Sequence, residues 1–419
     1  MASPLIRWPV LWSALLITLL LWPFATPGML GLRDMVVVPH PAVSFGDLPA
    51  RNFPQDGILA VLGKLFDASY AARLMLLAGA IAGAYGASRF GQRTWGKIAA
   101  ITLCLCNPFT IERLHQGHWS LVIAAWLLPL LVATKNPLVL WACSLTPTGA
   151  VIATVVGVAT GPWKKMLLVG ALSSLSWLVP SLQSVPGSST HAYLASHTGN
   201  IWNAEVAVWL PMLALFGLLL LAPRRLQILA WSGLILMLAI PWLLWLPGAS
   251  LFRDSNKLLM LALPAMVAGA ARIPPLALVF AALSFRPLPD VTVPTPDLPQ
   301  SEGDLLIVDS RGIVEYQGRV MVDPRLKANS SVQAGELRVD GEITDQASPR
   351  YTEALKHLDD DAWLREHHIG LVIDGDSQRE IGGITKPHPL GWALIFSWFA
   401  VPMICIKRRP VSSQENCCA

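Results

Sequence analysis

Apolar residues recur along the chain in runs that are separated mainly by short basic turns. A run of about 20 apolar residues is long enough to span a lipid bilayer as a helix. The pattern predicts helices at 8–25, 69–88, 97–107, 118–134, 165–182, 204–222, 226–246, 257–271, 273–285 and 389–406. Only Arg7 precedes the first run and no small-residue cleavage site follows it. We therefore interpret this run as a signal anchor rather than a cleaved signal peptide.

Residues 136–163 are also apolar, but Pro147, Thr148 and Gly149 interrupt them near the middle. We interpret this stretch as a hairpin of two short helices. The pattern leaves open whether the hairpin is re-entrant or consists of two full spans. The fold class predicted is an α-helical polytopic membrane protein with about 10–12 transmembrane helices.

Basic residues predict the orientation, because loops rich in Lys and Arg mark the cytoplasmic side of a membrane. Basic turns follow alternate predicted helices, at Arg89–Lys97, Lys135, Lys164–Lys165, Arg224–Arg225 and Arg272. Both termini are then cytoplasmic, in a multi-pass protein of the plasma (inner) membrane.

Residues 286–388 differ from the rest of the chain. They hold 19 of the 27 acidic residues and begin with a proline-rich linker. DLLIVDS, IVEYQGRVMVD and ELRVDGEI then alternate as strands do, and a helix at 350–367 precedes a buried strand, IGLVID. The predicted organisation is a membrane domain (1–285), a small extracytoplasmic α/β domain (286–388), a last helix (389–406) and a cytoplasmic tail (407–419).

Composition supports a membrane protein. Charged residues make up 14% of the chain, against about 25% in ordinary soluble domains, and the mean hydropathy is +0.51. The net charge of +4 is too small to suggest nucleic acid as a partner. No pair of cysteines has metal-ligand spacing, and the polar segment contains none, so we expect neither disulfides nor a cysteine metal site.

The segment 29–57 lies between the first two predicted spans and is longer and more apolar than a simple tether. It carries Asp34, Asp47 and Asp56 together with Arg33 and Arg51. A loop of this length and content is usually functional. We expect Asp56 to cap a short interfacial helix that begins at Gly57.

The motif NPFTIERLHQGHW follows the helix at 97–107. Asn107 is a good N-cap, Pro108 suits the first helical position, and Gly117 is a plausible stop. A separate short helix from Pro108 to Gln116 would place Glu112 and His115 on one face. Either these charges simply face water, or they face a substrate together with the neighbouring Arg113, His118 and Trp119.

The motif LFRDSNKLLM precedes the helix at 257–271, where Asp254 or Ser255 can serve as the N-cap. Arg253 and Lys257 add positive charge at this helix start, an arrangement suited to phosphate. Alternatively, both cations snorkel to lipid headgroups.

The motifs RDMVVVP (33–39), LPARNFPQDGILAVL (48–62), CNPFTIERLHQGHW (106–119) and FRDSNK (252–257) resemble those of an actinobacterial family of polytopic membrane proteins. That family is grouped with the GT-C glycosyltransferases and is similar in plan to the arabinofuranosyl- and mannosyltransferases of the cell envelope. The resemblance covers roughly residues 1–285, and the NPF-ERL-GHW block is its most specific part.

The resemblance implies a sugar donor carried on polyprenyl phosphate, an envelope glycan or glycolipid as acceptor, and transfer at the outer face of the membrane. It assigns catalysis to a carboxylate at the position of Asp34. Many GT-C enzymes have two adjacent acidic residues there, whereas Arg33 and Met35 flank Asp34 in this chain. A requirement for a divalent cation therefore stays open. The residues that we expect to bind substrate are Arg33, Glu112, Arg113, His115, His118, Arg253, Asp254 and Lys257.

Two other functional classes are compatible with the sequence. A non-catalytic protein that binds or scaffolds envelope glycans would lack the acidic pair, as this chain does. A flippase or transporter of lipid-linked sugars would carry ionisable residues deep inside its helices, and these are scarce here.

Overall fold

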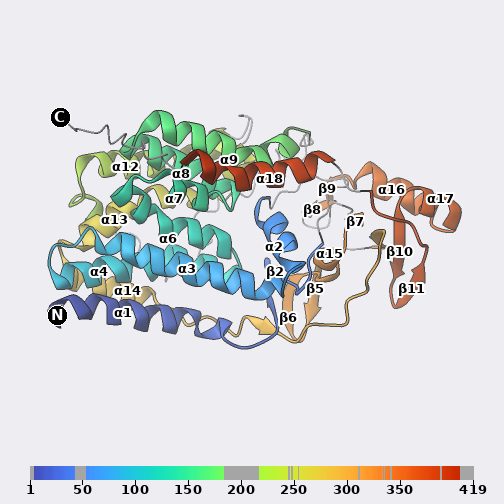
Figure 1. The fold of residues 1–419 in the computed structure, drawn as a ribbon, viewed down its shortest axis with the longest axis horizontal. Helices are drawn as coiled ribbons and strands as arrows, with labels where there is room; N and C mark the ends of the chain where they lie inside the picture. The colour runs from blue at the N-terminus through green and yellow to red at the C-terminus, as the bar shows by residue number, and fades with distance from the viewer. Residues whose placement is uncertain are drawn as a thin grey trace, which may run out of the picture.

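The computed structural model describes residues 4–42, 53–183, 217–243, 246, 249–252, 254–309, 312–332, 334, 336–339, 342–386 and 389–405. Within these ranges the chain is mostly helical, with small sheets concentrated toward the C-terminal part (Figure 1). The helices lie roughly parallel to the long axis of the molecule, and most of the strands gather at one end of it.

Most of the predicted helices are confirmed as helices, to within a few residues. The apolar part of the chain contains α1 (Pro4–Leu21), η1 (Trp22–Phe24), α2 (Gln55–Gly63), α3 (Ala68–Ser88), α4 (Thr94–Leu105), α5 (Pro108–His115), α6 (Trp119–Thr134), α7 (Pro137–Cys143), α8 (Pro147–Thr160), α9 (Trp163–Gln183), α12 (Arg224–Leu243), η3 (Ala249–Phe252), η4 (Ser255–Leu261), α13 (Leu263–Ala270), α14 (Pro274–Ser284) and α18 (Pro389–Cys405). The expected helix at 204–222 lies largely outside the described residues.

Two described helices are long and apolar enough to cross a membrane on length and composition alone: Ala68–Ser88 and Trp163–Leu182. Shorter apolar helices cover Trp8–Phe24, Trp119–Thr134, Pro147–Thr160, Pro274–Leu283 and Leu390–Cys405.

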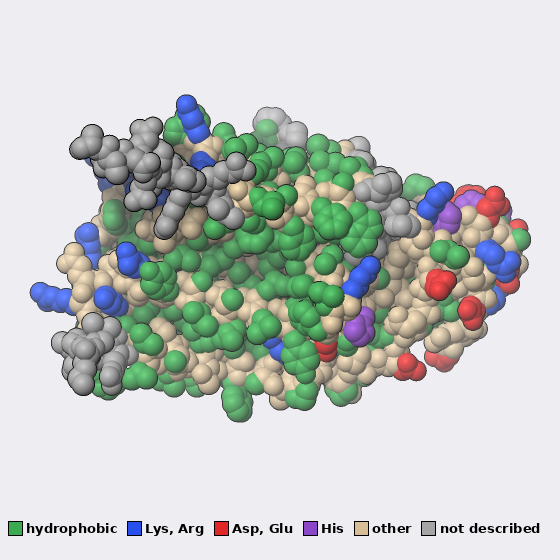
Figure 2. Space-filling view, in the orientation of Figure 1, with side chains coloured by type: hydrophobic (Ala, Val, Ile, Leu, Met, Phe, Trp, Pro, Cys, Tyr) green, Lys and Arg blue, Asp and Glu red, His purple; other side chains and the backbone are tan. Residues whose placement is uncertain are grey.

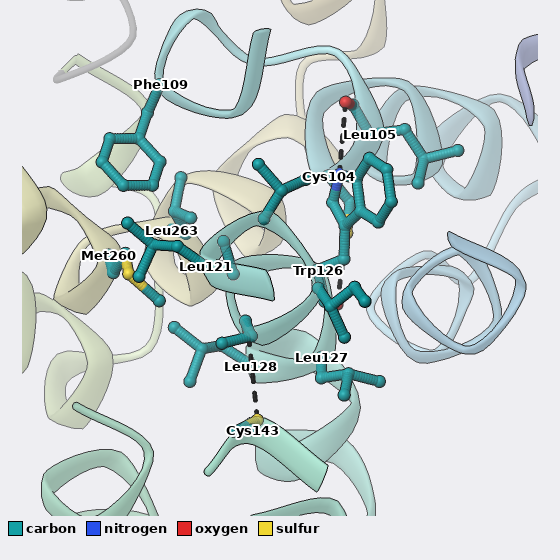
Figure 3. Packing of buried hydrophobic residues seen from close by; sticks show 14 of the residues in the cluster. Cys104, Leu105, Phe109, Leu121, Trp126, Leu127, Leu128, Cys143, Met260 and Leu263 are labelled. Carbon is teal, nitrogen blue, oxygen red and sulfur yellow. Dashed lines mark hydrogen bonds between the residues drawn. The ribbon is translucent and has the colours of Figure 1, made fainter. Parts of the chain in front are cut away.

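Helix α6 lies at the centre of the bundle because it is apolar on every side, as expected of a buried helix. Trp119 and Trp126 are both fully buried in it. Trp126 donates a hydrogen bond from Nε1 to the Leu105 carbonyl (3.4 Å), and the Cys143 thiol on α7 donates to the Ala124 carbonyl (3.7 Å; Figure 3). These contacts tie α4 and α7 to the central helix.

Three glycines on one face of α3 allow it to lie directly against α6. A Cβ atom at Gly83 would stand 2.8 Å from the Trp126 carbonyl oxygen, and one at Gly86 would stand 2.5 Å from the Leu130 backbone. Small residues at such spacing let helix backbones approach closely, as they do in membrane helix pairs.

Segment 29–57, which the sequence places between two helices, contains regular structure in its first part. Met29–Leu32 (β1) and Met35–Val37 (β2) form an antiparallel hairpin, and β1 also pairs with Thr292–Val293 (β3) from the linker. Asp47 and Arg51 lie outside the described residues. The predicted cap at Asp56 is also wrong, because Asp56 lies inside the first turn of α2 and accepts a hydrogen bond from Lys327 Nζ (2.8 Å).

The single helix expected at 257–271 is two elements, η4 and α13, which meet at Ala262 before Pro264. Proline removes a backbone donor and clashes with the preceding turn, so the helix restarts there. The helix expected at 350–367 is likewise divided into α16 (Pro349–Lys356) and α17 (Asp361–Glu366).

The strand-rich region contains the predicted strands. Its sheet has the order β11 (Ser377–Glu380), β10 (Ile369–Asp374), β4 (Asp304–Ile307) and β7 (Ser331–Val332), with β10, β4 and β7 parallel. Two hairpins and a short helix complete the region: β5 (Ile313–Tyr316) with β6 (Arg319–Val322), β8 (Leu337–Val339) with β9 (Glu342–Asp345), and α15 (Arg325–Ala328).

Candidate functional site

The turn of the β1–β2 hairpin presents Arg33 and Asp34. Leu32 pairs with Met35, so Arg33 and Asp34 form the two-residue connection between the strands. Arg33 adopts a positive φ of 50° in this turn. Both strands are buried, whereas the Asp34 side chain is 63% exposed. The hairpin therefore holds a carboxylate at the surface on a rigid support.

The β5–β6 hairpin supports this turn from the other side. Val322 on β6 donates its backbone N–H to the Arg33 carbonyl (3.1 Å), and Met321 forms a β-bridge with Arg33. Gly31 lies against the Val293 and Met321 side chains. The position of Asp34 thus depends on strands nearly 300 residues later in the sequence.

The short helix α5 begins and ends as its sequence predicts. The Asn107 side chain accepts a hydrogen bond from the Thr110 N–H (3.0 Å), and Pro108 occupies the first turn. Gly117 follows the helix with φ +82°, and an added Cβ would stand 2.4 Å from the Leu32 carbonyl oxygen and 2.5 Å from the Met35 nitrogen. The end of α5 is therefore pressed against the hairpin, and the Asp34 N–H points to the Gln116 carbonyl (3.4 Å).

A chain of hydrogen bonds connects Asp34 to the interior. His118 Nε2 lies 2.9 Å from Asp34 Oδ2, and His118 Nδ1 lies 3.2 Å from Arg113 Nη1. A guanidinium nitrogen can only donate, so Nδ1 accepts and the ring proton is on Nε2, which donates to Asp34. Arg113 thereby selects the His118 tautomer that supports the carboxylate.

Arg113 connects this chain to the start of η4. Its side chain is only 2% exposed, and its Nη1 also donates to Gln116 Oε1 (2.7 Å) and lies 3.4 Å from Asp254 Oδ2. Its Nη2 donates to the Asn256 side-chain oxygen. Burial lowers the pKa of the guanidinium, and the Asp254 carboxylate opposes that shift. Lys257, with 15% of its side chain exposed, also lies 3.4 Å from Asp254 Oδ2.

An apolar floor lies beneath the network. Phe109 stacks under the Arg113 guanidinium, 5.4 Å from ring centroid to Cζ. Phe109 belongs to the same buried cluster as Leu121, Met260 and Leu263, which come from α6, η4 and α13 (Figure 3). This packing fixes the relative positions of α5 and η4.

The structure therefore brings together five of the predicted site residues: Asp34, Arg113, His118, Asp254 and Lys257. Glu112 lies at the edge of the group and accepts a hydrogen bond from Gln116 Nε2 (2.9 Å). His115 ends α5 and is half-buried, and Arg33 points outward beside Asp34. Arg253 lies outside the described residues. Asp254 occupies the N-cap position of η4, one of the two positions expected, but its side chain makes no cap hydrogen bond and its carboxylate pairs with Arg113 and Lys257 instead.

Sequence reasoning missed Gln116 and Asn256, which both hold Arg113. Gln116 lies in the motif NPFTIERLHQGHW and Asn256 lies in LFRDSNKLLM, and membership of these polar motifs is the only sign of their role in the sequence. Both side chains accept hydrogen bonds from Arg113, and the bond to Asn256 exists only because α5 and η4 pack together. Among the residues that the structure describes, no group of three or more His, Cys, Asp and Glu side chains could hold a metal ion.

No protein-family model matches the chain, and no curated protein or solved structure matches it either.

The chemistry available at this site follows from its geometry. An exposed carboxylate that accepts a hydrogen bond from a neutral histidine can take a proton from a hydroxyl group. The cation Lys257 near the same network can interact with an anionic group. A carboxylate and a cation that belong to one hydrogen-bonded network are suited to a transfer reaction in which an anion departs.

Proposed function

We propose that this protein is a polytopic membrane glycosyltransferase of the GT-C type, related to the actinobacterial family that its motifs resemble. It transfers a sugar from a polyprenyl-phosphate donor to a cell-envelope glycan at the outer face of the membrane. Asp34 is the general base. The observation that carries the proposal is the orientation of this exposed carboxylate by His118 and the buried Arg113.

The surface of the helical part supports insertion in a membrane. Large apolar side chains are exposed along many helices, for example Leu15, Leu74, Leu167, Ile235 and Phe396. Exposed apolar surface of this extent marks a membrane or protein contact. In Figure 2, Lys and Arg side chains mark the end away from the strands, the acidic side chains gather at the strand-rich end together with further Lys and Arg, and the face between the two ends is largely hydrophobic.

This distribution favours more spans than the two that length and composition alone select. The basic turns at Arg89, Lys135, Arg224 and Arg272 are exposed. Helix α18 runs from the strand-rich end back toward the opposite end of the helical bundle (Figure 1). A positively charged end is expected on the cytoplasmic side. The site and the strand-rich region would then face outward.

The reaction forms one bond and breaks one bond at the anomeric carbon of the donor sugar. The acceptor hydroxyl oxygen attacks this carbon, the bond to the phosphate oxygen breaks, and polyprenyl phosphate leaves with the electron pair. Asp34 takes the hydroxyl proton, a role that contributes about 10²–10⁴-fold in typical enzymes. His118 donates to Asp34 and keeps the carboxylate in place.

Lys257 is the group that we assign to the departing phosphate, and Asp254 orients it. The sequence predicts that Arg113 binds substrate directly, but a guanidinium that is 2% exposed does not fit this role. It acts instead through His118 and Asp254, as a positioning residue.

The decisive experiment compares purified wild-type protein and Asp34→Asn in nanodiscs, with envelope glycolipids as acceptors and polyprenyl-phosphate sugars as donors. We expect transfer by the wild type and a loss of about 10²–10⁴-fold in the variant, with donor binding unchanged. A folded Asp34→Asn protein that transfers at the wild-type rate would refute the assignment of the base.

Orientation has its own test. A single cysteine at Ser301 should react with a membrane-impermeant maleimide on intact cells if the strand-rich region faces outward. Reaction only after lysis would place the site on the cytoplasmic side and contradict transfer at the outer face.

A further inference from the structure

A cleft of about 240 Å³ lies in the strand-rich region, away from the Asp34 network. Its lining comes from the carboxyl ends of β4 and β10, from β5 in the neighbouring hairpin, and from the start of α15. Its lining residues include Ile307, Asp309, Ile313, Asp323, Arg325 and Ile373.

The position of the cleft in the sheet is that of a ligand site. Strands β4 and β10 are parallel neighbours, and the chain leaves them in opposite directions, toward β7 on one side and β11 on the other. In open α/β sheets, ligands bind outside the carboxyl ends of strands at such a switch point.

The Asp309 side chain is the first polar group that lines this cleft, and the turn that carries it is held in place. Asp309 has a φ of 55°, and its N–H donates to the Tyr351 hydroxyl (3.0 Å), which in turn donates to the Ile307 carbonyl. Tyr351 is buried, so the turn that carries Asp309 is anchored in the core. Within the described part of the chain, the Asp309 carboxylate makes no hydrogen bond.

Arg325 supplies the donor. The buried Asp323 carboxylate accepts hydrogen bonds from Arg325 Nε (3.0 Å) and Nη2 (2.7 Å). Nη1 is not used in any bond to the residues that the structure describes and stays available. The remaining walls, from Ile307, Ile313 and Ile373, are aliphatic.

The chemistry of the cleft indicates a neutral ligand with neighbouring hydroxyl groups. Among the described lining residues, two carboxylates and one guanidinium give a net negative charge, which disfavours a phosphate or nucleotide. A hydroxyl group can donate to Asp309 while its neighbour accepts from Arg325. The volume is below the roughly 300–1,000 Å³ of sites for drug-sized ligands, so the cleft suits one ring rather than a nucleotide.

Backbone hydrogen bonds connect the cleft to the proposed active site. Val322 donates to the carbonyl of Arg33, the neighbour of Asp34, and the following residue, Asp323, lines the cleft and donates its N–H to the Gly312 carbonyl (3.1 Å). One hairpin thus connects the catalytic turn to the cleft.

We propose that this cleft binds one sugar ring of a neutral glycan through Asp309 and Arg325. The bound glycan is the acceptor, and the end of the glycan chain reaches Asp34. The role of this glycan as acceptor rests on the proposed function, whereas glycan binding does not.

The test measures binding of neutral arabinose, mannose and glucose tetrasaccharides to the full-length protein in nanodiscs by saturation-transfer NMR. We expect at least one of them to bind, and Asp309→Asn to weaken that binding about tenfold or more, as loss of a hydrogen bond to a charged acceptor does. Asparagine also tolerates the positive φ. The matched control is Asp359→Asn, an exposed position between α16 and α17 that does not line the cleft and should leave binding unchanged.

Three results would overturn the site: no binding of any tetrasaccharide, equal affinity for Asp309→Asn and Asp359→Asn, or displacement of the glycan by millimolar inorganic phosphate. The Asp34→Asn variant separates the two proposals, since it should bind glycan normally and not transfer. If the wild type binds through Asp309 but never transfers sugar, the proposed function fails and the glycan site stands.

Discussion

The two ends of the helical bundle use their cations in opposite ways. At the end away from the strands, Arg89, Arg93 and Arg272 are exposed in short turns between helices. At the other end, Arg113 is buried and donates to groups in the turn that follows its helix and at the start of η4. An exposed cation contributes little to stability and can vary, whereas a buried one dictates the geometry of its neighbours.

This comparison predicts the largest change in stability for Arg113→Met. Gln116 and Asn256 would lose the donor that they share, which costs about 2–6 kcal/mol in total when each loss is worth about 1–3 kcal/mol. Arg272→Met at the exposed end should change stability by no more than about 0.5 kcal/mol. Unfolding of both variants in detergent, followed by tryptophan fluorescence, provides the measurement. Equal losses for the two would mean that the network does not stabilise the fold.

The next prediction concerns the contact between His118 and Asp34. His118→Leu removes the donor that orients the carboxylate and should lower kcat/KM for transfer by about 10–100-fold, the scale of a misplaced catalytic group. His118→Gln retains an amide donor and should recover part of this loss. A purely structural role would instead give two variants whose activities follow their stabilities.

Gly117 provides a test of the junction between α5 and the hairpin. Gly117→Ala combines a positive φ with a clash against the Leu32 and Met35 backbone, so we expect a loss of about 1–3 kcal/mol in stability and reduced transfer. Gly217→Ala is the control, because an added Cβ there meets nothing within 4 Å. If Gly117→Ala behaves like Gly217→Ala, the hairpin is not held by this contact.

The smallest effect is expected where the strand-rich region touches α2. Lys327 and Asp56 form a partly exposed ion pair, worth about 0.2–1 kcal/mol in a double-mutant cycle. Lys327→Gln and Asp56→Asn, alone and combined, measure this coupling, and the exposed pair of Lys356 and Glu353 within α16 is the reference. A coupling energy well above 1 kcal/mol would show that this contact, and not only the hairpins, fixes the strand-rich region in place.

Local patterns were sufficient for most of the helices. Apolar runs predicted α3, α6, α9 and α18, since a helix satisfies its own backbone hydrogen bonds and needs only an apolar surface to be placed. The Asn107 cap and the stop at Gly117 were also predictable, because both depend on residues within one helical turn. The polar motifs that contain Asp34, Arg113, His118 and Lys257 were recognisable as polar groups concentrated at the edges of apolar runs.

Only the tertiary structure decided how these groups are used. The hairpin at Asp34 forms because β3 and β6, from the far end of the sequence, complete its hydrogen bonding, and no local pattern reports such a partner. Asp56 pairs with Lys327 rather than capping a helix, and Arg113 is buried rather than facing a substrate, for the same reason. Charge and hydrogen-bonding capacity are properties of the residue, but the partner that uses them depends on which distant segment packs beside it.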